Sequence, residues 1–155
     1  GVPGQHRIER VAGRAALGTG SPALVGMGTQ QVTFSELAEL TSRVVRQLAE
    51  AGVRTEHRVG LLVPPGMPGG QLVVALASST TLVPINPALK PQEVIDLAIV
   101  TGLHAIVIPR WLETEARSAM LQRRVTVLEA VRTPDGTLGL ELLTAPAGSP
   151  APGTA

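Results

Sequence analysis

Few residues of this sequence have the types and spacing that catalysis requires. The chain holds one lysine, Lys90, and no cysteine, which excludes thiolate catalysis, disulfides and zinc–thiolate sites. Its histidines, His6, His57 and His104, belong to separate predicted elements and lack the short helical spacing of a metal-binding pair. No glycine-rich phosphate loop precedes Lys90. We therefore predict no catalytic residue and no metal site in this chain.

Residues 26–31 resemble the start of a dinucleotide-binding fingerprint. The segment Gly-Met-Gly-Thr-Gln-Gln follows a predicted strand, but it lacks the third glycine and leads into another strand. A fingerprint needs a helix N-terminus there to receive a pyrophosphate. A hairpin turn is the better interpretation.

The elements that must position any site alternate between strand and helix. The clearest is a helix over residues 35–51, where Thr33 and Glu36 form a capping box and Gly52 follows the last turn. We also expect Glu39 and Arg43 to pair on its outer side. Further helices are predicted at 6–17, 68–79, 91–101 and 112–122, and strands at 23–27, 31–33, 59–63, 82–85, 104–108, 125–128 and 138–143.

This order predicts an α/β fold with a mainly parallel, doubly wound sheet flanked by helices. A short N-terminal strand pair precedes the sheet, and an Asp-Gly signal at Asp135 predicts a C-terminal hairpin. Residues 144–155 contain only Ala, Pro, Gly, Ser and Thr, a composition typical of linkers. We therefore expect one folded unit over residues 1–143 and a linker or disordered tail over 144–155.

The loops that follow the first two strands of the parallel sheet are the best candidates for contact with a ligand. In open parallel sheets, ligands bind beyond the carboxyl ends of the strands. Pro65, Gly66 and Asn86 stand at such ends, so we predict that they form part of a pocket wall. The alternative is that they simply make turns.

Composition narrows the classes of partner. The net charge is +1, and the cationic residues are spread among acidic ones rather than gathered in a stripe, which argues against nucleic acid. Only Phe34 and Trp111 are aromatic, too few for a base-stacking platform. No apolar run approaches the ~20 residues that span a bilayer, and we expect no secretory signal because no charged segment precedes an apolar one. We expect a cytoplasmic protein.

Four segments together suggest a family. They are Thr33-Phe34-Ser35-Glu36-Leu37, the run His-Arg-Val-Gly-Leu-Leu-Val-Pro-Pro-Gly at 57–66, Leu-Val-Pro-Ile-Asn-Pro-Ala at 82–88, and Gly-Leu-His-Ala-Ile-Val-Ile at 102–108. Their order resembles the N-terminal subdomain of the adenylate-forming superfamily, which includes acyl-CoA synthetases, peptide-synthetase adenylation domains and luciferases. The resemblance covers roughly residues 8–130. His57 stands where the family usually has Asp, Pro65 where it has Asn, and Thr80-Thr81 where it has Gly-Ala.

The resemblance implies an enzyme that activates a carboxylic acid as an acyl-adenylate and passes it to a thiol. Its substrates and cofactors would be ATP, Mg²⁺ and CoA or a carrier-protein thiol. The family's Ser/Thr/Gly-rich loop ending in Gly-Lys, its later acidic residue and its catalytic lysine are not found here. We therefore expect the chain to be the catalytically incomplete N-terminal portion of an acid–CoA ligase, with no cofactor of its own.

The expected partners are the remainder of the adenylating domain or neighbouring domains, and a second copy of the chain is a further candidate. An alternative is a truncated, non-catalytic half-domain that serves as a structural or docking module in a multidomain synthase. A third is an unrelated small nucleotide-binding α/β domain.

Overall fold

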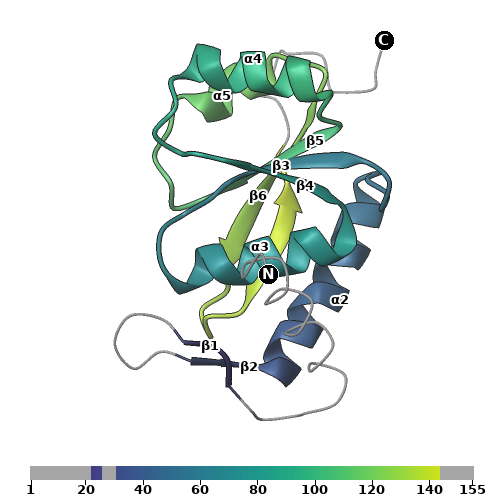
Figure 1. Cartoon of the computed structure of the whole chain (residues 1–155), viewed down its shortest axis with the longest axis vertical. Coiled ribbons are helices and arrows are strands. Elements are labelled where there is room, and N and C mark those ends of the chain that lie inside the picture. Colours follow the sequence, from purple (N-terminus) through teal and green to yellow (C-terminus); the bar gives the residue numbers. More distant parts are fainter. Residues whose placement is uncertain (1–21, 26–30, 144–155) are drawn as a thin grey trace, which may run out of the picture.

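A computed structural model describes residues 22–25 and 31–143, and Figure 1 shows the elements in this part of the chain. In order they are β1 (Pro22–Val25), β2 (Gln31–Thr33), α2 (Phe34–Glu50), β3 (Arg58–Leu62), α3 (Met67–Ser79), β4 (Thr81–Ile85), α4 (Pro91–Thr101), β5 (Ala105–Pro109), α5 (Ala116–Leu121), β6 (Thr126–Arg132) and β7 (Leu138–Leu142). The predicted helix at 6–17, the turn at 28–30, His6 and the tail at 144–155 lie outside the described residues. None of the described helices is long and apolar enough to cross a membrane.

The main sheet has the strand order β4-β3-β5-β6-β7. Strands β3 to β6 pair in parallel, whereas β7 returns antiparallel to β6. Helices α2 and α3 lie on one side of this sheet and α4 and α5 on the other (Figure 1). The short pair β1–β2 is antiparallel. The predicted α/β class, the mainly parallel sheet and the C-terminal hairpin are therefore confirmed.

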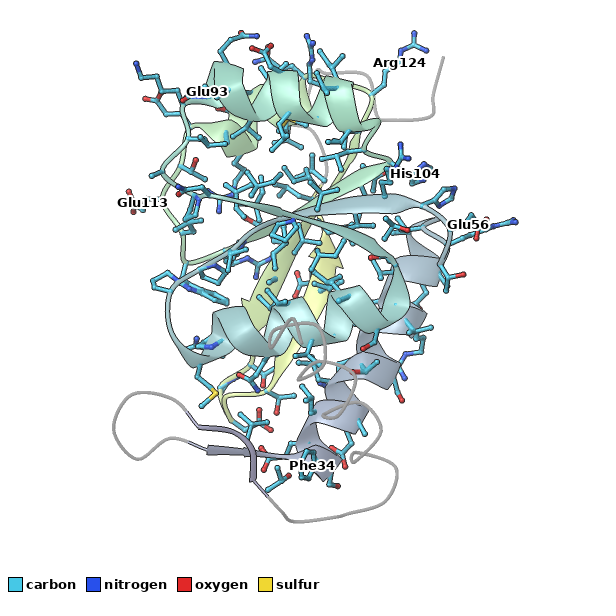
Figure 2. The ribbon with its side chains drawn as sticks, in the orientation of Figure 1. Phe34, Glu56, Glu93, His104, Glu113 and Arg124 are labelled. Atoms are coloured by element: carbon cyan, nitrogen blue, oxygen red, sulfur yellow. The ribbon has the colours of Figure 1, made fainter. Side chains whose placement is uncertain are left out.

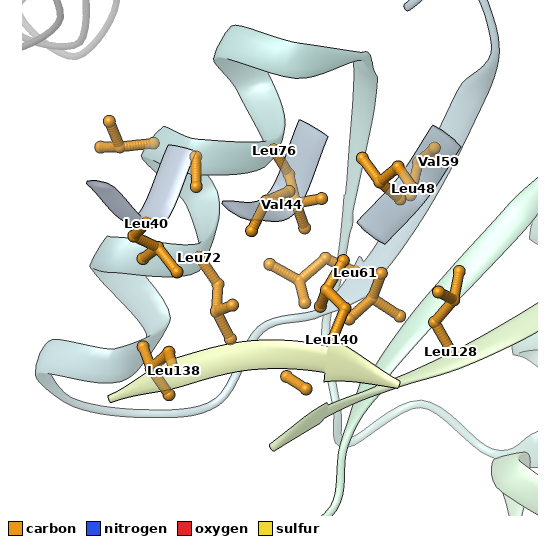
Figure 3. Packing of buried hydrophobic residues seen from close by; sticks show 14 of the residues in the cluster. Leu40, Val44, Leu48, Val59, Leu61, Leu72, Leu76, Leu128, Leu138 and Leu140 are labelled. Atoms are coloured by element: carbon orange, nitrogen blue, oxygen red, sulfur yellow. The ribbon is translucent and has the colours of Figure 1, made fainter. Parts of the chain in front are cut away.

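The face under α2 and α3 holds the larger core (Figure 3). Apolar residues at helical spacing give α2 a buried stripe, and they pack on α3, on the inward residues of β3 and on β7. The residues of this core, from all four elements, include Leu40, Val44, Leu48, Val59, Leu61, Leu72, Leu76, Leu138 and Leu140. The capping prediction holds in part, because Thr33 Oγ1 accepts the Glu36 N–H at 3.1 Å. Gly52, with φ +81°, follows the end of α2 as expected.

The opposite face carries a second core under α4 and α5. Side chains alternate along a strand, so Ile106 and Ile108 of β5 point to this face, while Ala105 and Val107 belong to the first. Val94 and Ala98 of α4 and Met120 of α5 close it. The residue after α4, Gly102, is left-handed with φ +66°, and it ends that helix as predicted.

Side chains of α2 cover part of the outer edge of β7. Arg43 Nη1 donates to Leu138 O at 2.8 Å, and the Leu140 N–H donates to Gln47 Oε1 at 2.7 Å. The predicted pairing of Glu39 with Arg43 is therefore wrong, because the strand edge offers Arg43 an unpaired carbonyl. Gly139 lies between these contacts, and a Cβ there would be 3.3 Å from the Gln47 amide nitrogen.

Two predicted boundaries need correction. The helix expected at 112–122 is only α5, Ala116–Leu121. Thr114 Oγ1 accepts the Ala116 N–H at 3.1 Å, and Arg117 Nη2 donates to the carbonyls of Pro109 and Leu112. These bonds hold 112–115 as a loop. The strand expected at 125–128 extends to Arg132, because β7 pairs with it as far as Leu138.

Candidate functional site

The carboxyl ends of β3 to β6 lie at one edge of the sheet because these strands are parallel. In Figure 2, Glu113, which follows β5, lies on the side opposite Glu56 and His104, which precede β3 and β5. At this carboxyl edge the chain leaves all four parallel strands. The edge is therefore the first place to search for a site.

The structure brings the exit loops of β3 and β4 together at this edge. Leu62 pairs with Ile85, and the Val63 N–H donates to Ile85 O at 3.1 Å. Pro65, Gly66 and Asn86 follow these residues and are all exposed. Asn86 Oδ1 accepts the Ala88 N–H at 2.8 Å, so its side chain stabilises its own turn. The shared edge is as predicted, but a role in ligand binding stays a prediction.

The turn from β3 into α3 is unusually tight. Gly66 caps α3 with φ +83°, and the Gly69 N–H donates to Gly66 O at 3.2 Å. A Cβ on Gly69 would lie 2.0 Å from Pro64 O, so this position requires glycine. Gly69 therefore allows the chain to turn closely at this edge.

Residues beyond β5 and β6 complete the carboxyl edge, and sequence reasoning missed them. Arg110 and Trp111 follow β5, and Arg132 ends β6. The Arg132 guanidinium lies 4.8 Å from the centroid of the Trp111 ring, within the range of a cation–π contact. Only strand register brings these residues together, so no local sequence pattern predicts their contact.

An open pocket of about 480 Å³ lies beside residues 110–117, which follow β5, and paired charged side chains line it. Arg110, Leu112, Glu113, Thr114, Glu115 and Arg117 form its wall. The buried carboxylate of Glu129 lies 2.9 Å from Arg110 Nε and 2.8 Å from Arg117 Nε. The second contact is an ion pair rather than a hydrogen bond, since the Arg117 Nε–H has no aligned acceptor.

These charges neutralise one another. Arg110 Nη2 also lies 2.9 Å from Glu141 Oε1, and the hydrogen bonds to Glu141 and Glu129 raise the pKa of Arg110. Arg117 is paired with Glu129 as well. With each guanidinium already matched by a carboxylate, the network is suited to holding the 109–115 loop in place rather than to binding a phosphate.

The two described histidines lie together on the opposite, amino edge. His57 and His104 stack with ring centroids 3.7 Å apart and planes 5° apart, although 47 positions separate them in sequence. His57 Nδ1 accepts the Arg54 N–H at 2.8 Å. The lone pairs of stacked rings lie in parallel planes and do not converge on one metal ion. Among residues 22–25 and 31–143, no group of three metal-binding side chains is found.

Comparisons with solved structures match the described fold. CmiS6 is 16% identical with a TM-score of 0.68, over 92% of this chain and 33% of that one. A nonribosomal peptide synthetase, FmoA3, bound to α-methyl-L-serine-AMP, is 25% identical with a TM-score of 0.63, over 79% and 13%. MenE of Bacillus subtilis, an O-succinylbenzoate CoA synthetase in complex with ATP and magnesium, is 19% identical with a TM-score of 0.61, over 77% and 32%.

The chain thus spans a third or less of the length of these three proteins. No curated protein matches the sequence. The model of the family described as "AMP-binding enzyme", however, matches residues 11–152, which is nearly the whole chain. This chain therefore belongs to the AMP-binding enzyme family.

Proposed function

We propose that the chain is the N-terminal portion of an ATP-dependent acid–thiol ligase and is catalytically incomplete by itself. Its family membership carries this proposal. The neighbours support it, since one was solved with an aminoacyl-AMP and another is a CoA synthetase with ATP and magnesium. In the complete reaction, a carboxylate oxygen attacks the α-phosphorus of ATP and pyrophosphate leaves. A thiol then displaces AMP to give the thioester. Such ATP-dependent chemistry suits a cytoplasmic protein.

The chain's own residues account for the proposed incompleteness. Its single lysine, Lys90, stands at the start of α4, where its backbone N–H donates to Glu93 Oε1. The arginines nearest the carboxyl edge, Arg110 and Arg117, are matched by carboxylates. We therefore assign ATP and magnesium binding to other parts of the AMP-binding domain.

The chain would contribute scaffold and part of a pocket wall. Pro65, Gly66 and Asn86 are our candidates for that wall, because they are exposed together at the carboxyl edge. Trp111 and Arg132 extend the same edge. The rest of the domain would determine which carboxylic acid is activated and whether CoA or a carrier-protein thiol accepts the acyl group.

The test is ATP–pyrophosphate exchange with the purified chain and a panel of carboxylic acids, alongside an intact adenylating enzyme as the positive control. We expect no exchange above the acid-free blank. Acid-dependent exchange by the chain alone would refute its incompleteness. A parallel NMR titration with the same acids and ATP checks the wall: weak shifts should be confined to Gly66, Asn86 and their neighbours, and shifts centred elsewhere would reject these residues.

A non-catalytic structural or docking module is the second candidate. One feature of the described fold favours this candidate: each face of the sheet is covered by helices and has its own core. A module of this kind would unfold cooperatively and form one defined species. Exchange activity restored by adding the missing part of an AMP-binding domain would instead favour the ligase fragment.

A further inference from the structure

Helix α4 carries more apolar side chains than its buried face uses. Val94 and Ala98 are its buried residues, but Ile99 is 62% exposed and Val100 is 83% exposed. These are the two most exposed large hydrophobic residues of the described chain. Helix α2, in contrast, exposes only Val45 to a comparable degree, at 43%. We call Ile99 and Val100 the α4 patch.

Charges of opposite sign flank the α4 patch, an acidic one from α4 itself and a basic one from the start of β3. The exposed carboxylate of Asp96 lies one turn before Val100 and accepts a hydrogen bond from Gln92 Nε2 at 2.9 Å. At the other end, the exposed Arg58 donates from Nη1 to Thr101 O at 2.9 Å. The same nitrogen lies 3.6 Å from where a Cβ on Gly102 would be. The outer surface therefore runs from acidic through apolar to basic.

A surface with this order is complementary to itself when turned by 180°. If two α4 helices pack antiparallel about an axis between Ile99 and Val100, the two apolar patches meet at the centre. Asp96 of each copy then lies opposite the segment after Thr101 of the other, where Arg58 is held. The helix dipoles also run in opposite directions, which is favourable. The acidic end of each α4 patch therefore faces the basic end of the other.

We propose that α4 is a homodimer interface, formed by isologous, antiparallel packing of the α4 patch on a second copy of the chain. This inference is independent of the proposed ligase function. Two exposed apolar side chains per copy bury far less than the ~1,200 Å² of a stable complex. The dimer is therefore weak and exchanges rapidly with monomer.

Sedimentation velocity over a concentration series tests the proposal. The unmodified chain should show a weight-average sedimentation coefficient that rises with concentration and fits monomer–dimer exchange. Val100→Asp should raise the dimer dissociation constant at least about tenfold, equivalent to about 1.4 kcal/mol. Val45→Asp is the matched control, an exposed valine on α2, and should leave the constant unchanged. Because both sites are exposed, circular dichroism should be unaltered.

A monomer at every concentration would overturn the proposal, as would an equal effect of both substitutions. Larger species in place of a dimer would also contradict a twofold interface.

Cross-linking supplies a second readout, because it traps a transient dimer covalently. The chain has no cysteine, so Val100→Cys and Val45→Cys each introduce a single thiol. A short bismaleimide is preferable to oxidation, since a disulfide needs Cα atoms within about 7 Å. The Val100→Cys chain should form cross-linked dimer several-fold faster than the Val45→Cys chain. Equal rates would mean random collision and would reject α4 as the interface.

Discussion

Removing the carboxylate of Glu129 should destabilise the fold more than any other single charge deletion around the 109–115 loop. The Glu129 side chain is 8% exposed and lies within 2.9 Å of two guanidinium groups. In Glu129→Ala, the largely buried Arg117, 23% exposed, loses its only carboxylate partner among the described residues.

Removing one member of a buried ion pair destabilises a protein by about 3–5 kcal/mol. Arg117 keeps its hydrogen bonds to the carbonyls of Pro109 and Leu112, and its side chain retains some contact with water. We therefore expect the lower end of that range, about 3 kcal/mol. The matched control is Glu141→Ala, which removes an exposed partner of Arg110 and should have a much smaller effect.

Urea unfolding measures both variants, with far-UV circular dichroism for the whole fold and Trp111 fluorescence for the loop. Trp111 is the sole tryptophan, so its signal reports the carboxyl edge. A double variant, Glu129→Leu with Arg117→Met, should recover much of the loss because no unpaired charge is then buried. The reasoning fails if Glu129→Ala lowers stability no more than Glu141→Ala, or if the double variant is no better than Glu129→Ala.

Two further predictions concern turns. Gly69→Ala should lower the free energy of unfolding by more than about 3 kcal/mol, since its Cβ would meet the Pro64 carbonyl oxygen and backbone must shift; an unchanged urea midpoint would contradict this. Hydrogen bonds from the Thr133 hydroxyl and from Thr137 lower the pKa of Asp135 from 3.8 to about 2. The stabilisation from this turn is thus complete above pH ~4 and is lost as the pH falls towards 2. Asp135→Asn should remove that part of the acid sensitivity, and an identical acid-unfolding curve would count against the turn.

The predictable parts of the fold were those that local chemistry specifies. The Thr33 hydroxyl, together with apolar residues at helical spacing, located α2 to within one residue at each end. Gly52 and Gly102 marked the ends of helices because left-handed backbone favours glycine. Apolar runs located β3, β4 and β5 closely. Strands β3 and β5 have few polar residues because both of their faces are buried, whereas β4 is an edge strand that keeps an apolar run although it is only partly buried.

The failures arose where a side chain binds a backbone group that the periodicity of one helix does not reveal. The loop at 112–115 is held by Arg117 and Thr114, whose side chains bind backbone groups that a longer helix would have used. Arg43 pairs with a strand 95 positions away rather than with Glu39. Neither contact can be found from spacing along one helix.

In the candidate site, too, local chemistry predicted some positions, whereas strand pairing determined others. The positions of Pro65, Gly66 and Asn86 at one edge followed from strand-end chemistry and parallel topology. The approach of Arg132 to Trp111 depends on the pairing of β5 with β6, and no sequence pattern predicts that register. The stacking of His57 on His104 likewise follows from the neighbouring positions of β3 and β5.

The bonds from Arg43 and Gln47 to β7 also bear on how the chain folds during synthesis. Helix α2 is made early, but its partner strand is among the last described residues to be made. Until Leu140 has left the ribosome, the apolar stripe of α2 lacks one wall of its core, and such incomplete surfaces favour misassembly. Contacts so distant in sequence also slow folding. We therefore expect the nascent chain to be most prone to misassembly until the β6–β7 hairpin has emerged.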